Sequence, residues 1–251
     1  MVRAKQNEST TRPQVRGSRL NGALAVARDA VRFAVTPSRR NLLHWLSWVV
    51  TLSVVLITTV ILVDGQIYGW EEYLTRRVQE ADYPIWLIRL TSDDLTSTFA
   101  WQGLLVIASI VTVLWLLRQR VAAALAVLAL PLHVVGNFPK AIVDRNRPSE
   151  LFEGIFGVGG GRSFPSGHSE FAVTFFGFVA FLALIHLRGR LQRVGVVLVW
   201  LVFAISVGIG RIADGRHWPL DVLIGYVIGI GLLSGLIWLH TAFYQAKERA
   251  E

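Results

Sequence analysis

The sequence contains no cysteine. A disulfide framework, a thiolate zinc site, an iron–sulfur cluster and a cysteine nucleophile are therefore all excluded. Charged residues are also scarce, at 17% of the 251 residues, whereas 53% are hydrophobic and the mean hydropathy is +0.49. This balance is unfavourable for a water-soluble domain and favours a protein that is embedded in a membrane.

The apolar residues form runs about as long as the ~20 residues that a helix needs to cross a bilayer. We expect about six spans, at residues 42–63, 98–117, 121–139, 167–187, 194–212 and 219–243. Continuous apolar runs favour helices over barrel strands, in which polar and apolar residues alternate. The predicted fold is therefore an all-α, polytopic membrane helical bundle, in which spaced glycines of the last span, including Gly225 and Gly229, allow close helix packing.

Basic residues predict the orientation of this bundle. The segment before residue 42, the turn at 118–120, the loop at 188–193 and the carboxyl end hold sixteen of the 25 Lys and Arg residues. With six spans all four segments lie on one side, which the positive-inside rule makes cytoplasmic. Because the positive charge sits in these short segments, the net charge of +8 does not indicate nucleic-acid binding.

The domain organisation follows from the same pattern. Residues 1–41 form a basic cytoplasmic tail, 42–244 form one membrane domain, and 245–251 form a second short tail. The first tail has no apolar core before a cleavage site, so we expect the first span to be retained as an anchor. The tail is either an amphipathic helix on an anionic membrane surface or a partly disordered segment, and its pattern leaves both open.

Three polar clusters lie on the opposite side: Lys140-AIVDRN-Arg147-Pro148, Ser163-F-Pro165-Ser166-Gly167-His168 and Arg211-IADGR-His217-WPL-Asp221. Each alone has an ordinary explanation, as snorkelling cations, a helix start or a structural hydrogen-bonded pair. Together they suit a phosphoryl group, since Arg and Lys match phosphate oxygens and backbone N–H groups at a helix start favour anions. The two histidines supply a nucleophile and a proton donor. If residues 217–221 begin a helix, Asp221 lies on the face of His217 and can accept from one ring nitrogen.

At matching spacings and in the same order, these clusters resemble the K-x6-RP, PSGH and SR-x5-H-x3-D motifs of the type-2 phosphatidic acid phosphatases. That superfamily includes lipid phosphate phosphatases and soluble vanadium-dependent haloperoxidases, and the resemblance spans residues 98–243. It implies that His217 is the nucleophile, that Asp221 orients it and that His168 protonates the leaving group. It also implies a phosphate site, with no metal and no other cofactor, formed by Lys140, Arg147, Ser166, Gly167 and Arg211. Gly210 departs from the family pattern, where serine often precedes this arginine.

The resemblance favours a membrane lipid phosphatase whose site faces the outer side of a bacterial inner membrane, with both termini cytoplasmic. Its partners would be membrane lipids and a lipid phosphate or diphosphate substrate, while the oligomeric state is not predicted. We favour undecaprenyl diphosphate, with phosphatidylglycerophosphate, phosphatidic acid and a lipid A phosphate as alternatives.

Outside the enzymes of lipid phosphate hydrolysis, a lipid or anion transporter would share the cations but would not need the histidines. A vanadate-using haloperoxidase is disfavoured by the six spans. Charges outside the motifs, at Arg145, Arg162, Asp214 and Arg216, are interpreted as solvated loop charges rather than headgroup contacts. The segment 64–97, with Arg76, Arg77, Arg89, Asp93 and Asp94, is likewise interpreted as a solvated loop rather than a substrate lid.

Overall fold

The computed structural model describes residues 25–26, 28–29, 39–81, 96, 101–148 and 161–250. The predictions for most of the amino-terminal tail, and for Arg89, Asp93 and Asp94, lie outside these residues.

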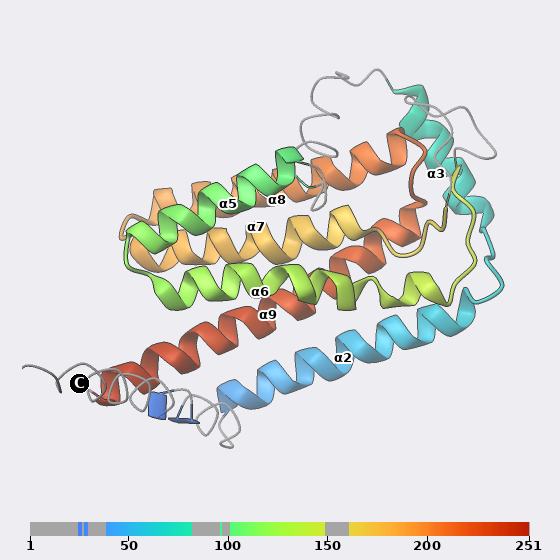
Figure 1. Ribbon diagram of the computed structural model, residues 1–251. Coiled ribbons are helices and arrows are strands. Elements are labelled where there is room, and N and C mark those ends of the chain that lie inside the picture. Colours follow the sequence, from blue (N-terminus) through green and yellow to red (C-terminus); the bar gives the residue numbers. More distant parts are fainter. Residues whose placement is uncertain are drawn as a thin grey trace, which may run out of the picture.

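All the regular secondary structure of the described residues is helical, which confirms the all-α prediction (Figure 1). The helices are α2 Arg39–Ile61, α3 Gly69–Glu80, α5 Trp101–Leu116, α6 Arg120–Gly136, the short 3-10 helix η2 Phe138–Ala141, α7 Gly167–His186, α8 Arg190–Ala213 and α9 Pro219–Ala250. Within the described part, five helical segments are long and apolar enough to cross a membrane. Helix α5 has 16 residues and is shorter, so the sixth span stays a prediction.

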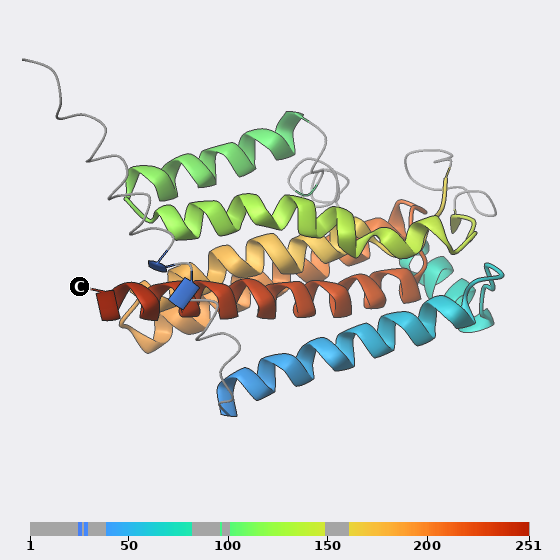
Figure 2. The ribbon, with the colours of Figure 1, turned by 60° about the horizontal axis from the view of Figure 1, so that its bottom comes forward.

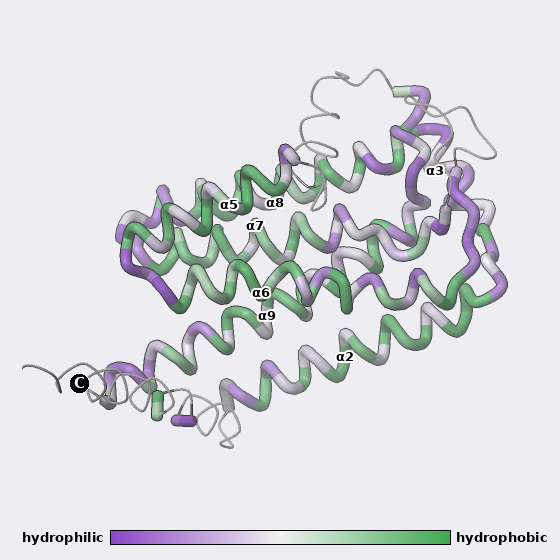
Figure 3. The backbone as a smooth tube through the Cα atoms, viewed as in Figure 1, coloured by the Kyte–Doolittle hydropathy of each residue, from purple (hydrophilic) through white to green (hydrophobic). Residues whose placement is uncertain are grey.

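Helix α7 lies inside the bundle, where it contacts α6, α8 and α9 (Figures 1 and 2). Its phenylalanines Phe171, Phe175 and Phe178 are fully buried against the alanine-rich face of α6. Large apolar side chains also cover much of the outside of the bundle, many of them on α2. Figure 3 shows that hydrophobic residues make up most of the length of the bundle's helices. Apolar residues on both the inner and the outer faces suit a bundle surrounded by lipid.

Glycines of α9 allow it to approach two other helices closely. A Cβ atom on Gly225 would lie 2.5 Å from the carbonyl oxygen of Ser166, and one on Gly229 would lie 2.8 Å from that of Glu170 on α7. On the α2 side, a Cβ on Gly231 would lie 2.7 Å from Thr51. The predicted role of these glycines in close helix packing is therefore confirmed.

The segment after α2 is not the solvated loop that we predicted. Residues 69–80 form α3, which lies across the end of the bundle and contacts α8 and α9 (Figure 1). Arg76 and Arg77 are exposed, but Glu71 and Thr75 on the same helix are fully buried. The loop prediction failed because a carboxylate can be buried when it gains a cationic partner, and α3 carries such a carboxylate.

The two ends of the bundle differ in character. The α5–α6 turn, the α7–α8 turn and the carboxyl terminus lie at one end, on the left in Figure 1, and hold the basic residues of the short connections. The last turns of α6 and α8 and the first turns of α7 and α9 meet at the other end, beside α3. All three polar clusters of the sequence therefore share one end.

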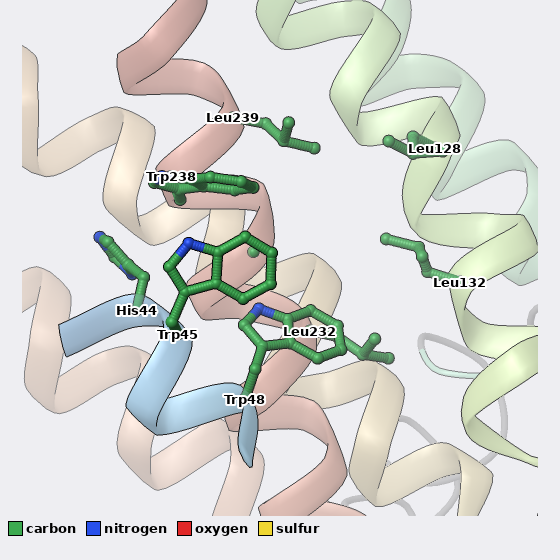
Figure 4. Close-up of a pocket in the computed structure, with 9 residues that line it drawn as sticks. His44, Trp45, Trp48, Leu128, Leu132, Leu232, Trp238 and Leu239 are labelled. Carbon is green, nitrogen blue, oxygen red and sulfur yellow. The ribbon is translucent and has the colours of Figure 1, made fainter. Parts of the chain in front are cut away.

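An apolar cavity of about 230 Å³ lies between α2, α6 and α9 (Figure 4). It is lined by His44, Trp45, Trp48, Leu128, Leu132, Leu232, Gly235, Trp238 and Leu239. His44 is the titratable side chain in this set, and its Nδ1 lies 2.8 Å from Ser234 Oγ. Because its walls offer no Lys or Arg, this cavity is unsuited to a phosphate group.

Candidate active site

The three polar clusters line a second cavity, of about 330 Å³, at the α3 end of the bundle. Its lining residues are Thr96, His133, Val134, Asn137, Lys140, Arg147, Gly167, His168, Arg211 and His217. Six of the eight residues that the sequence singled out are among them. The other two, Ser166 and Asp221, are fully buried and are not among the lining residues.

His217 stands in the short connection between α8 and α9 and is 2% exposed. Its Nδ1–H donates to the carbonyl oxygen of Ser163 at 2.7 Å, which leaves Nε2 as the nitrogen that carries a lone pair. Burial lowers the pKa of His217 well below its usual 6.5, and the positive charges of Lys140, Arg211 and Arg147 lower it further, against the Ser163 hydrogen bond. The imidazole is therefore neutral at physiological pH.

Asp221 does not form the hydrogen bond to His217 that the spacing suggested. Its Oδ2 is 3.8 Å from His217 Nδ1 and instead accepts the backbone N–H of Trp218 at 2.8 Å. The reason is that α9 begins at Pro219, so His217 precedes the helix and the i,i+4 relation does not apply. Trp218 Nε1 in turn donates to the carbonyl of Asn146 at 2.8 Å. Asp221 thus fixes the turn that carries His217.

Arg145, which we interpreted as a solvated loop charge, is 1% exposed and lies at the centre of an ionic network. Its Nη1 donates to Asp221 Oδ1 at 2.5 Å, its Nη2 contacts Glu71 Oε2, and its Nε donates to the carbonyl of Gln66 at 3.0 Å. All three charged side chains are 0% exposed. Buried carboxylates need a cation, and Arg145 supplies one cation to both.

Glu71 extends this network to the start of α9. Its Oε1 accepts the backbone N–H of Leu220 at 3.2 Å, and its Oε2 accepts that of Tyr68, also at 3.2 Å. Burial raises the pKa of Glu71, while the charge and the hydrogen bond of Arg145 oppose that shift. Helix α3 is therefore joined to the His217 turn through Arg145 and through Leu220.

The three predicted phosphate-binding cations surround the cavity from different segments. Lys140 comes from η2, Arg147 from the loop that follows it, and Arg211 from the last turn of α8. Arg211 Nη1 is 3.9 Å from Asp214 Oδ2, which also accepts from Arg216 Nε at 3.0 Å. Asp214 is fully buried, so its interpretation as a solvated charge was also wrong.

Ser166 and Gly167 begin α7 beside the cavity. The Ser166 N–H donates to the backbone carbonyl of Asp221 at 3.0 Å, and its Oγ lies 2.9 Å from Ser169 Oγ. A Cβ on Gly167 would lie 2.8 Å from Asn137 Oδ1, so a larger residue would displace the Asn137 side chain. Ser166 therefore ties α7 to α9, and Gly167 leaves the backbone open to the cavity.

Residues 115–245, more than half of the chain, match the family model described as the PAP2 superfamily. The chain belongs to the PAP2 superfamily. This confirms the family that the three motifs predicted.

Curated PAP2 relatives match over a short segment. The bacitracin transport permease protein BcrC of Bacillus licheniformis is 40% identical over 81 residues, which are 32% of this chain and 34% of BcrC. Phosphatidylglycerophosphatase B of Escherichia coli is 36% identical over 81 residues, 32% of this chain and 29% of that protein. The matched segment therefore spans about a third of each relative or less.

Two solved structures share the fold over most of the chain. A transmembrane PAP2-type phosphatidylglycerolphosphate phosphatase from Bacillus subtilis superposes with a TM-score of 0.58 and 24% identity, covering 80% of this chain and 97% of that one. LpxE of Aquifex aeolicus superposes with a TM-score of 0.50 and 24% identity, covering 68% and 96%. This PAP2 chain thus shares its polytopic helical fold with a transmembrane protein.

Two signals in the PAP2 sequence could have located the missed residues. Acidic Glu71 and Glu72 followed by basic Arg77 are typical of the first and last turns of a helix, so α3 was predictable. His133, Asn137 and Lys140 recur at helical spacing and line one cavity, which marks α6 as a contributor. The burial of Arg145 had no comparable signal.

Proposed function

We propose that this chain is a lipid phosphatase that hydrolyses a lipid phosphate or diphosphate through a phosphohistidine intermediate. The observation that carries the proposal is the convergence of His217, His168 and three cations on one cavity, with His217 Nδ1 bonded to Ser163 so that Nε2 is the reactive nitrogen. Neutral imidazole held in this way is a competent nucleophile toward phosphorus.

In the first step, His217 Nε2 attacks phosphorus as the bond to the leaving oxygen breaks. Lys140, Arg147 and Arg211 neutralise the charge on the phosphoryl oxygens, and His168 as imidazolium gives its proton to the leaving oxygen. The dephosphorylated lipid leaves.

In the second step, water attacks the phosphohistidine. Neutral His168 removes the proton from this water, the phosphorus–nitrogen bond breaks, and inorganic phosphate departs. His217 recovers its neutral form and His168 its proton. Asp221 contributes by fixing the Trp218 backbone, and the scheme assigns no step to a metal ion or other cofactor.

The substrate and the membrane side form part of the proposal. Basic connections at the opposite end favour a cytoplasmic location for that end, and so an extracytoplasmic site in a bacterial inner membrane. There a lipid can keep its chains in the bilayer and present its phosphate to the cavity. Undecaprenyl diphosphate is our preferred substrate, and phosphatidylglycerophosphate, phosphatidic acid and a lipid A phosphate are the alternatives.

The test is phosphate release by the purified protein in detergent, from a panel of these lipids, with and without excess EDTA. We expect activity that EDTA does not remove, and its loss in His217→Ala and His168→Ala. When a reaction with ³²P-labelled lipid is quenched at alkaline pH, the wild type should carry an acid-labile label that His217→Ala lacks, and this difference would locate the intermediate. Full activity of His217→Ala would exclude the assigned nucleophile, and loss with EDTA would contradict metal independence.

A further inference from the structure

An apolar groove of about 550 Å³ lies between α5 and α7, at the end of the bundle opposite to the phosphate cavity. Side chains of both helices line it, including Val113 and Leu114 of α5 and Leu182 and Ala183 of α7. Val113 is exposed, as is Leu117, which also lines the groove, so the groove opens onto the outer surface of the bundle. Its size is in the range of ligand sites, and its lining suits a hydrocarbon chain.

The groove exists because α5 has one main neighbour among the described helices. Helix α5 lies at the edge of the bundle and packs mainly against α6 (Figure 2). Helix α7 packs against α6, α8 and α9 instead. Apolar side chains that face an empty space lose their dispersion contacts, and an apolar lining gives water few hydrogen-bond partners. In a membrane, a lipid chain is therefore the favoured occupant.

The groove contains a polar pair, Gln119 and His186, in addition to its apolar walls. The Gln119 Nε2 atom lies 3.0 Å from His186 Nε2, and His186 Nδ1 lies 2.7 Å from the carbonyl oxygen of Leu182. Because Nδ1–H donates to that carbonyl, Nε2 is the acceptor for the Gln119 amide. The pair joins the α5–α6 turn to the last turn of α7, so both connections meet beside the groove.

Two basic segments flank this polar pair. They hold five exposed arginines, Arg118, Arg120, Arg188, Arg190 and Arg193. The first two adjoin Gln119, and the other three follow His186 in the α7–α8 connection and the first turn of α8. Neither 117–120 nor 187–193 contains Asp or Glu. The positive-inside rule explains basic connections in general, but it does not explain an apolar groove beside them.

Arg118 stands at a backbone position that favours glycine. Its φ is +60°, a left-handed conformation that is uncommon for residues with a Cβ atom. The Arg118 N–H donates to the Trp115 carbonyl at 3.0 Å, and the Gln119 N–H donates to the Leu114 carbonyl at 2.9 Å. This is the hydrogen-bond pattern of a Schellman helix end, in which the left-handed residue is usually glycine. An arginine there carries a backbone cost, which points to a use for its guanidinium group.

We infer that the groove between α5 and α7 binds one anionic phospholipid, with a chain along the groove and the phosphate at Arg118 and Arg188. Basic pockets between transmembrane helices suit anionic headgroups, and guanidinium groups match phosphate oxygens. The bound lipid fills the space between α5 and α7 and so stabilises the edge helix. The site lies at the end opposite to His217 and its lipid is not hydrolysed, so the inference does not depend on the proposed function.

The test is thermal unfolding of the full-length protein in dodecyl maltoside micelles, with increasing mole fractions of phosphatidylglycerol or of phosphatidylcholine with the same chains. A lipid that binds the folded protein raises its unfolding temperature. We expect a saturable rise with phosphatidylglycerol and a smaller rise with phosphatidylcholine. Arg118→Gly should require about fivefold more phosphatidylglycerol for half of the rise, the contribution of one arginine beside anionic lipid. Without lipid it should unfold at the same temperature or higher, because glycine accepts the left-handed turn.

Two further variants separate the groove from a general effect of charge. Ala183→Phe fills the groove and should reduce the rise with both lipids, and if it does not fold, Arg118→Gly decides the test. Arg77→Gln removes one exposed positive charge from α3 at the other end and should leave the phosphatidylglycerol requirement unchanged. A rise that Arg118→Gly leaves unchanged would place the lipid elsewhere, including the phosphate cavity, and would overturn the inference. Equal rises with the two lipids would likewise exclude recognition of an anionic headgroup.

Discussion

Replacing Arg145 by Met should be among the most damaging single substitutions outside the motif positions. Arg145 is the cation shared by Glu71 and Asp221, and all three side chains are 0% exposed. The substitution leaves two buried carboxylates facing each other without a counter-charge. Removal of one partner from a buried ion pair costs about 3–5 kcal/mol, so we expect a loss of stability of at least that order.

A second substitution, whose effect on stability changes sign in the Arg145→Met background, distinguishes this ionic network from simple packing. Glu71→Gln alone loses charge-assisted hydrogen bonds but leaves Arg145 and Asp221 as a balanced pair, so it should cost about 1–3 kcal/mol. Added to Arg145→Met, it removes one of the two unpaired charges. The double variant should therefore be more stable than Arg145→Met, although each substitution alone destabilises.

These effects can be measured as thermal unfolding in detergent, followed by tryptophan fluorescence, with phosphate release assayed well below the midpoint. Because Arg145 holds Asp221, which fixes the His217 turn, residual folded Arg145→Met should have a lowered kcat with a smaller change in KM. Arg77→Met is the matched control, since Arg77 and Glu80 form an exposed pair at 3.5 Å that contributes little. If Arg145→Met unfolds at the same temperature as Arg77→Met, the network does not stabilise the fold.

Two other predictions concern packing and titration. Gly225→Ala should destabilise the bundle by about 1–3 kcal/mol in thermal unfolding, because its Cβ would lie 2.5 Å from the Ser166 carbonyl, whereas Gly195→Ala, with open space around it, should be neutral or slightly stabilising. The acid limb of kcat/KM should lie below pH 6.5, because the lowered pKa of His217 keeps the nucleophile unprotonated, and Lys140→Met should move this limb to higher pH by removing a charge that opposes protonation. If the acid limb does not move in Lys140→Met, the group that titrates there is not His217.

Local features of the chain were predictable because each depends on residues close in sequence. Apolar runs predicted the positions of the long helices, since span length is set by the bilayer. The gathering of the motif cations and histidines at one end was also predictable. The basic connections mark the cytoplasmic end, and the loops that hold the motifs alternate with them and so lie at the other end. The predicted span at 219–243 lies within α9, which continues to Ala250 because helical backbone needs no apolar side chains outside the membrane.

Partners that are distant in sequence were not predictable. Glu71 is 74 residues from Arg145 and 149 from Leu220 in the sequence. In an amphipathic helix, the residue type alone does not distinguish a buried glutamate from a solvated one. The same applies to His133 and Glu170, which are 37 residues apart on different helices. Sequence spacing indicates a contact within one helix, whereas these contacts depend on how helices cross.

The His217–Asp221 pair shows why even a short spacing can mislead. They are four positions apart, yet the helix begins between them, and the carboxylate accepts the backbone N–H of Trp218, the residue next to His217, rather than a hydrogen bond from the His217 ring. The position of His217 thus depends on Asp221, the position of Asp221 on Arg145, and that of Arg145 on Glu71 and the Gln66 carbonyl. Neither Glu71 nor Gln66 belongs to a motif. If the proposed roles are correct, a chain with all three motifs intact but without α3 should therefore bind phosphate with its three cations and still hold the proposed nucleophile His217 poorly.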